Sequence, residues 1–454
     1  MRDPRGNLAI EKGRVVRKLH DRLKSEDFLF QAVARELVRD GLLVDFEVPD
    51  DLQVTAPRVA WVSQPTEWCG AQLLDAAQLS LDVAERSLTA GFELKDASAW
   101  NVIFDGSVPV FCDHLSFQRI CRREWRALGQ FARHFILPLL VAARTGLQTH
   151  AQFSMFRDGI TPQLARKICG WRMLFSRAAP LMLAASPGAA RAPDPPLETA
   201  SAISTTLHAN LLRYCRFSLP SRARMQSRQE SSARGSAREW SNYVQEREHY
   251  GASAIDLKLQ QVRAWIERTA PSWVLDLGAN TGEFSLLAVQ GGARVIALDS
   301  DHDCMQRLYL HAHHHSAYAS AIFPVIAQLD DLCAGRGWRG REVQGLDARL
   351  AGHCDLVMML GLLHHLMIAC AIPVAEVAEF AAILTREWLI LETVSEHDPM
   401  FQTLAAQYDR TSDAARVCGQ AAQLAAFARH FDIVDRSPLP GSNRTLLLLI
   451  KKVA

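Results

Sequence analysis

The stretch VLDLGANTGEFS (residues 274–285), followed by VIALDSD (295–301), decides the fold of the second half of this 454-residue chain. Residues 273–277 form a short apolar run, which predicts a buried strand, and a helical pattern follows at 283–289. A second strand is predicted at 293–298. A strand that leads through a glycine-rich turn into a helix brings bare backbone N–H groups close to a ligand. The two segments therefore predict a ligand site at the carboxyl end of a parallel sheet.

Side chains at the two strand ends and in the turn are suited to hold that ligand. Asp299 ends the second strand, where a carboxylate can accept both hydroxyls of a ribose. Asp276 ends the first strand and can reach an ammonium directly or through water. The ligand is expected to approach over the turn residues Gly278, Asn280, Thr281 and Gly282.

Three alternatives to this site exist. A dinucleotide-binding fold requires GxGxxG, whereas this turn reads Gly-Ala-Asn-Thr-Gly. A phosphate-binding P-loop requires GK[ST], which does not follow here. An ordinary strand–turn–helix without a ligand stays open. The DxGxxxG turn, with its acidic second strand end, resembles the S-adenosyl-L-methionine site of class I methyltransferases.

The rest of the second half alternates strand and helix signals, which predicts a parallel sheet with helices on both faces. Further strands are predicted at 355–360, 388–391 and 446–450, with a helix at 374–384. The segments 431–436 and 445–451 are joined by LPGS, a turn suited to an antiparallel hairpin.

Other residues are singled out by where they fall in a fold of the class I methyltransferase kind. The segment DLVMMLGLLHHL (355–366) places His364 and His365 after the fourth strand, where either can act as general base or pack structurally. Glu392, at the end of the fifth strand, is expected to bind or deprotonate the acceptor, or to pair with an arginine. Gln328 or Asp330 is expected to read the adenine edge.

Over nearly its whole length the chain resembles bacterial class I methyltransferases related to nodulation proteins. The likeness rests on HYGASAIDLK (249–258), GWRGRE (337–342), LETVSEHDPM and SNRTLLL in the back half, and on PTEWC and WRALGQFARHFILPL in the front half. It implies a seven-stranded, mostly parallel sheet with an antiparallel last strand, preceded by an α+β domain. Gln328 departs from the family, in which an acid or asparagine is more usual.

A second motif lies in the front half, in LKDASAWNVIF (94–104) and PVFCDHLSF (109–117). Asp96 and Asn101 precede a hairpin that returns to Asp113, an order that resembles the catalytic loop and metal-binding strand of protein and aminoglycoside kinases. Three interpretations stay open: an active phosphotransfer site, a degenerate kinase-like module for substrate selection or docking, and unrelated packing. Lys12-Gly13 can turn a small hairpin that presents Arg17 or Lys18.

Two composition breaks predict the domain organisation: an α+β domain at 1–215, a polar Arg/Ser-rich linker at 216–248 and a cofactor-binding domain at 249–454. The 50 Lys+Arg and 49 Asp+Glu residues leave no bulk attraction for nucleic acid or membrane. Neither a signal peptide nor a CxxC metal pair is recognised, so a reducing, cytoplasmic setting without a structural metal is expected. The cluster His311, His313, His314 and His315 is interpreted as a solvated helix end.

The sequence thus predicts an enzyme that uses S-adenosyl-L-methionine to methylate an oxygen or nitrogen of a small-molecule or glycan-like acceptor. His365 or His364 is the expected base, with Glu392 orienting it. Two alternatives remain: another use of the sulfonium, such as internal cyclisation, and a regulatory module that binds the cofactor without turnover.

Overall fold

The computed structural model describes residues 5–121, 124–185, 202–223, 252–410 and 416–453. The chain forms two compact units, Met1–Gly235 (unit 1) and Ser236–Ala454 (unit 2). Most of the predicted linker, 224–248, lies outside the described residues. Its first residues belong to helix α8 (Ala202–Ser218), where Arg216 pairs with Asp82 at 2.7 Å and with Glu85 at 3.1 Å. The start of the predicted linker is therefore part of unit 1.

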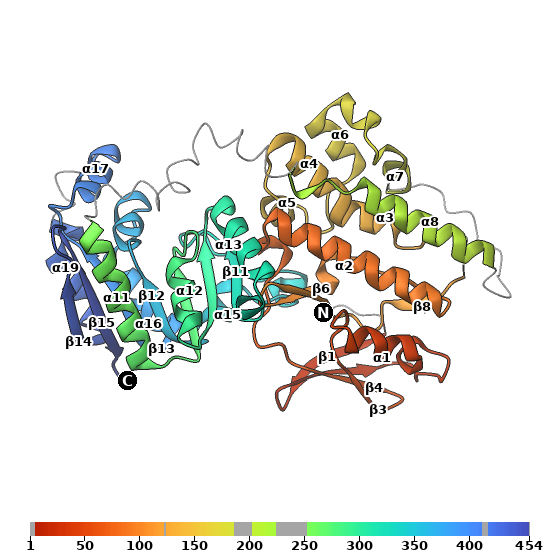
Figure 1. The fold of residues 1–454 in the computed structure, drawn as a ribbon, viewed down its shortest axis with the longest axis horizontal. Helices are drawn as coiled ribbons and strands as arrows, with labels where there is room; N and C mark the ends of the chain where they lie inside the picture. Colours follow the sequence, from red (N-terminus) through yellow and green to blue (C-terminus); the bar gives the residue numbers. More distant parts are fainter. Residues whose placement is uncertain (1–4, 122–123, 186–201, 224–251, 411–415, 454) are drawn as a thin grey trace. The chain divides into compact units, whose positions relative to one another are not determined.

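Unit 2 has an α/β fold built on one mixed sheet with the strand order β11-β10-β9-β12-β13-β15-β14 (Figure 1). The first five of these strands are parallel, and β15 runs antiparallel to both β13 and β14. From β9 the chain adds β10 and β11 on one side and then crosses to β12 on the other, so the strand order reverses between β9 and β12. The strands are β9 (Trp273–Leu277), β10 (Arg294–Asp299), β11 (Ile322–Ile326), β12 (Cys354–Met359), β13 (Thr385–Val394), β14 (Phe431–Pro438) and β15 (Arg444–Lys451).

Helices cover this sheet, and the connections between its parallel strands are helical (Figure 1). Helix α12 contacts β9 and β10, α13 contacts β10 and β11, and α16 contacts β12 and β13. Strand β13 is longer than predicted because it pairs with β15 from Trp388 to Val394. The helices are α11 (Ala252–Thr269), α12 (Glu283–Gln290), α13 (His302–His314), α14 (Ser316–Ala319), α15 (Leu346–Leu350), α16 (Val374–Leu384), α17 (Pro399–Gln407) and α19 (Gln420–Phe427).

Unit 1 begins with an antiparallel sheet of order β1-β2-β4-β3. Its first hairpin turns at Lys12 (φ 50°) and Gly13 (φ 76°), which confirms the predicted turn, since a tight hairpin favours two positive φ angles. The predicted hairpin at 101–111 is also present, but Asp105 pairs with Val108, so the turn consists of Gly106-Ser107, one residue later than the Asp-Gly pair suggests. The strands are β1 (Gly6–Glu11), β2 (Arg14–Leu19), β3 (Glu47–Asp50), β4 (Gln53–Pro57), β5 (Phe92–Leu94), β6 (Val102–Asp105), β7 (Val108–Phe111) and β8 (Phe117–Arg119).

The helices of unit 1 depart from prediction at two places. The apolar pattern at 28–43 predicts one helix, but the α-helix there covers only Ala32–Arg39 (α1) and ends before Gly41, which adopts a positive φ of 71°. The pattern at 125–141 also predicts one helix, and a π-helical turn interrupts it just before Pro138, whose ring lacks the N–H that an α-helix needs. The others are α2 (Gly70–Thr89), α3 (Leu128–Phe131), α4 (Leu137–Thr145), α5 (Thr149–Met155), α6 (Pro162–Cys169) and α7 (Ala179–Ala184).

Candidate cofactor and acceptor site

The turn after β9 and the end of β10 form one hydrogen-bonded unit. The Asp299 carboxylate accepts the backbone N–H of Asn280 at 2.7 Å and that of Asp301 at 2.8 Å. The N–H groups of Gly278 and Ala279 both donate to the carbonyl of β10 residue 298. Burial raises the pKa of Asp299, while its backbone hydrogen bonds act in the opposite direction. Asp299 remains half-exposed at the carboxyl edge of the sheet, where it can meet a ligand.

The two glycines of this turn serve different purposes. Gly278 has φ 72°, and a Cβ built there would lie 3.4 Å from Cδ1 of Leu362 in the loop after β12. Gly282 has φ 85°, and its Cβ would lie only 2.4 Å from Cδ1 of Leu308, a buried residue of α13. A Cβ at this position would therefore force Leu308 to shift, and the predicted approach of a ligand over Gly282 stays a prediction. Asn280, with φ 50°, accepts the N–H of Thr281 through its side chain.

Asp276 lies beneath this turn and is only 2% exposed. Its Oδ2 accepts the hydroxyl of Ser285 from α12 at 2.6 Å. Burial raises the pKa of Asp276 to about 6, assisted by the charge of Asp299 and opposed by the Ser285 hydrogen bond. A cation placed beside this carboxylate would stabilise its ionised form.

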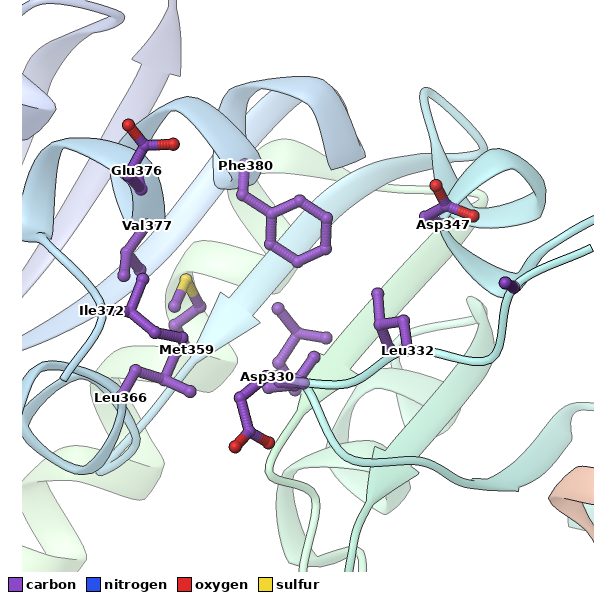
Figure 2. Close-up of a pocket in the computed structure, with 12 residues that line it drawn as sticks. Asp330, Leu332, Asp347, Met359, Leu366, Ile372, Glu376, Val377 and Phe380 are labelled. Carbon is purple, nitrogen blue, oxygen red and sulfur yellow. The ribbon is translucent and has the colours of Figure 1, made fainter. Parts of the chain in front are cut away.

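An apolar cavity of about 410 Å³ opens beside the ends of β9 and β12. Figure 2 shows Leu332, Met359 and the Phe380 ring around it, with the Asp330 carboxylate at one margin. Asp330 therefore lies where a planar ligand could be bound. Gln328, the other predicted adenine reader, does not line the cavity and forms an isolated bridge with Asp331.

The two predicted histidines differ in exposure. His364 is fully buried, whereas His365 is half-exposed, and their rings lie 4.1 Å apart. The backbone N–H of His365 donates to the backbone carbonyl of Leu362, the residue whose side chain faces Gly278. Burial, and then the charge of Arg444, lower the pKa of His365 to about 4. His365 thus follows three residues after Leu362, and its burial favours the neutral form of the ring.

Glu392 belongs to a buried ionic network. Lys258 of α11 donates to its Oε2 at 2.5 Å, and Arg444 donates to its Oε1 at 3.2 Å. Arg444 also binds Asp398 through Nε at 2.8 Å and Nη2 at 3.1 Å. Because two cations hold Glu392, the structure favours the prediction that Glu392 pairs with an arginine over the prediction that it deprotonates the acceptor.

Lys258 and Arg444 were not predicted as site residues. Both stand in segments that carry the family resemblance, HYGASAIDLK and SNRTLLL. Those segments were the available signal, but only the fold shows that the two cations meet at one carboxylate.

The front-half motif also comes together in unit 1. Asp113 accepts Arg17 of β2 at 2.6 Å and the hydroxyl of Ser116 at 2.5 Å, and Asn101 donates to the same hydroxyl at 3.2 Å. Burial raises the pKa of Asp113, but Arg17 and Ser116 outweigh it, so the net shift is downward. Burial and the charge of Asp113 raise the pKa of Asp96. Arg17, rather than Lys18, is the basic residue at this cluster.

The histidine cluster lies at the end of α13, where the rings of His311 and His315 are 4.6 Å apart. Across the described parts of both units, no group of three or more His, Cys, Asp or Glu side chains is arranged to hold a metal ion. Among these same residues, no helix combines the length and apolar character needed to cross a membrane.

The chain is 28% identical to nodulation protein NoeA of Rhizobium meliloti (strain 1021) over 464 residues, covering 98% of this chain and 94% of NoeA. No family model matches it. Magnesium protoporphyrin IX methyltransferase from Synechocystis, solved with bound SAH, aligns with 44% of this chain and 84% of its own, at 17% identity and a TM-score of 0.31. The N-methyltransferase NodS from Bradyrhizobium japonicum aligns with 44% of this chain and 98% of its own, at 10% identity and a TM-score of 0.32.

Proposed function

We propose that unit 2 binds S-adenosyl-L-methionine and transfers its methyl group to a small-molecule or glycan-like acceptor. The observation that carries this proposal is the Asp299 carboxylate, held by two backbone N–H groups at the end of β10, next to the reversal of strand order. The donor set fits the cofactor: Asp299 suits the ribose hydroxyls, Asp276 the ammonium, and the cavity beside Asp330 the purine.

When bound, the cofactor supplies a methyl group on a sulfonium, and the protein contributes mainly alignment. His365 is the proposed proton acceptor because it is half-exposed and follows closely on Leu362, which faces the cofactor turn. With a pKa of about 4, His365 is neutral at pH 7 and ready to accept a proton. Such a weak base suits an acceptor group whose own proton is fairly acidic.

Calorimetric titration with S-adenosylmethionine and S-adenosylhomocysteine tests the cofactor assignment. Asp299→Ala should weaken the binding of both ligands by about 100-fold or more, since it removes charge-assisted hydrogen bonds to the two ribose hydroxyls. Asp303→Ala, in the first turn of α13, removes a carboxylate that the site does not use; it is the matched control and should bind both ligands normally. Absence of binding by the folded wild-type chain would refute the proposal.

Product analysis separates the chemical alternatives. Methyl transfer releases S-adenosylhomocysteine, whereas attack within the aminobutyryl chain releases methylthioadenosine. A regulatory module would bind the cofactor and release neither. If His365→Ala binds the cofactor normally and turns over at the wild-type rate, the base assignment is wrong.

Unit 1 supports a second candidate, phosphotransfer or its binding remnant, with Asp96 facing an acceptor hydroxyl. The observation in its favour is that Arg17 of β2 reaches Asp113, while Asn101 shares a hydroxyl partner with it. An active site predicts magnesium-dependent nucleotide binding that Asp113→Ala abolishes. A docking module predicts no nucleotide binding by either protein.

A further inference from the structure

Lys258 is a lysine in an unusual setting. Its side chain is only 10% exposed, and lysine is rarely buried unless a counter-charge accompanies it. Its ammonium donates to Glu392 at 2.5 Å and lies 5.1 Å from the centre of the Phe284 ring. Phe284 stands in the first turn of α12, directly after the cofactor turn. Lys258 therefore places a positive charge beside the start of the proposed cofactor site.

The sheet register places on one face the two carboxylates with which Lys258 interacts. Asp276 of β9 is level with Met358 of β12, which is level with Ile390 of β13. Glu392 stands two residues beyond Ile390, so it lies on the same face of the sheet as Asp276. The charge of Lys258 also stabilises the ionised form of Asp276.

The far side of Glu392 is anchored. Arg444 is fully buried, contacts the second oxygen of Glu392 and is held by two hydrogen bonds to Asp398. Asp398 in turn accepts the backbone N–H of Met400 at the start of α17. This chain of contacts fixes Glu392, which fixes the position of the Lys258 ammonium.

Resting on the function proposed above, we propose that Lys258 binds the carboxylate of an α-amino acid group, the tail of S-adenosylmethionine, while Asp276 receives its ammonium. An ammonium has three N–H donors and can serve two carboxylates at once. A zwitterionic tail brings one charge of each sign, which matches Lys258 and Asp276. Glu392 is then a positioning residue for Lys258.

The test compares two ligands that differ in this tail. S-adenosylhomocysteine has the amino acid group, and 5′-methylthioadenosine keeps the adenosine and thioether without it. In calorimetric titrations of the full chain, Lys258→Met should weaken the binding of S-adenosylhomocysteine by about 10–100-fold. The affinity for methylthioadenosine should stay within about twofold of wild type. Lys258→Gln, which keeps a donor for Glu392, is a second variant with the same expected split. Lys452→Met, at an exposed lysine beyond β15, should change neither affinity.

Glu392→Gln tests the positioning role with the same pair of ligands. It should weaken the binding of S-adenosylhomocysteine by a smaller factor than Lys258→Met does, and it should leave the affinity for methylthioadenosine unchanged. An equal loss for both ligands would show that Glu392 acts on the fold alone and would overturn the positioning role.

The outcomes separate this inference from the function on which it rests. If the wild-type chain binds neither ligand, the cofactor proposal fails. If it binds S-adenosylhomocysteine and the Lys258 variants bind it equally well, the cofactor proposal stands and the role of Lys258 is overturned. If the Lys258 variants lose both ligands equally, Lys258 only supports the fold, and the inference is again overturned.

Discussion

Replacing Arg444 by methionine should destabilise unit 2 more than any exposed substitution. Arg444 begins β15, its side chain is fully buried, and its guanidinium donates to both oxygens of Asp398 and to Glu392. Methionine keeps much of the side-chain length but supplies no donor. The variant therefore leaves two carboxylates buried with fewer partners.

The magnitude follows from what each carboxylate retains. Glu392 keeps its contact with Lys258, and Asp398 keeps the N–H groups of Met400 and Phe401. Breaking a buried ion pair from one side costs about 3–5 kcal/mol, and these remaining contacts place the loss within that range rather than above it. Since a domain of this size loses about 2–4 °C per kcal/mol, the melting temperature should fall by about 6–20 °C.

The assay is urea unfolding of the full chain followed by hydrogen exchange in peptides from β13 and β15, so that unit 2 is read separately. Arg436→Met, at an exposed arginine on neighbouring β14, is the matched control and should change stability by about 0.5 kcal/mol or less. Adding Asp398→Asn to Arg444→Met should recover part of the loss, because it removes one of the stranded charges. A loss below about 1 kcal/mol for Arg444→Met would refute the reasoning.

Two further predictions concern the cofactor turn. Because burial raises the pKa of Asp276 to about 6 from 3.8, the folded chain holds a proton there between about pH 4 and 6, and its stability falls as the pH rises through that window. Asp276→Asn should therefore gain about 3 kcal/mol relative to wild type between pH 4 and 7 in denaturant unfolding, and a constant difference would contradict the shift. Gly282→Ala should cost about 1–3 kcal/mol more than Gly292→Ala, because both have positive φ but only the first meets Leu308, and equal melting temperatures would refute the packing argument.

The cofactor turn could be predicted because its determinants are local. Strand β9 matches the predicted range 273–277, and helix α16 matches 374–384. Glycine permits positive φ and a carboxylate at a strand end faces the sheet edge in any parallel fold, so a short motif identifies the residues. The hairpin turns at Lys12-Gly13 and Gly106-Ser107 follow from the same local chemistry, since each contains a glycine with positive φ.

The sequence by itself determined the strand–turn–helix around Gly278 and the carboxylates at its two strand ends. It also determined how strands and helices alternate along the chain of unit 2. Only the tertiary structure decided that a Cβ at Gly282 would meet Leu308, that His364 is buried while His365 is half-exposed, and that Lys258, Glu392, Arg444 and Asp398 form one network. Lys258 and Glu392 are 134 residues apart, and Glu392 and Arg444 are 52 apart. Contacts over such separations depend on strand order, register and the packing of a helix on the sheet, which no local pattern encodes.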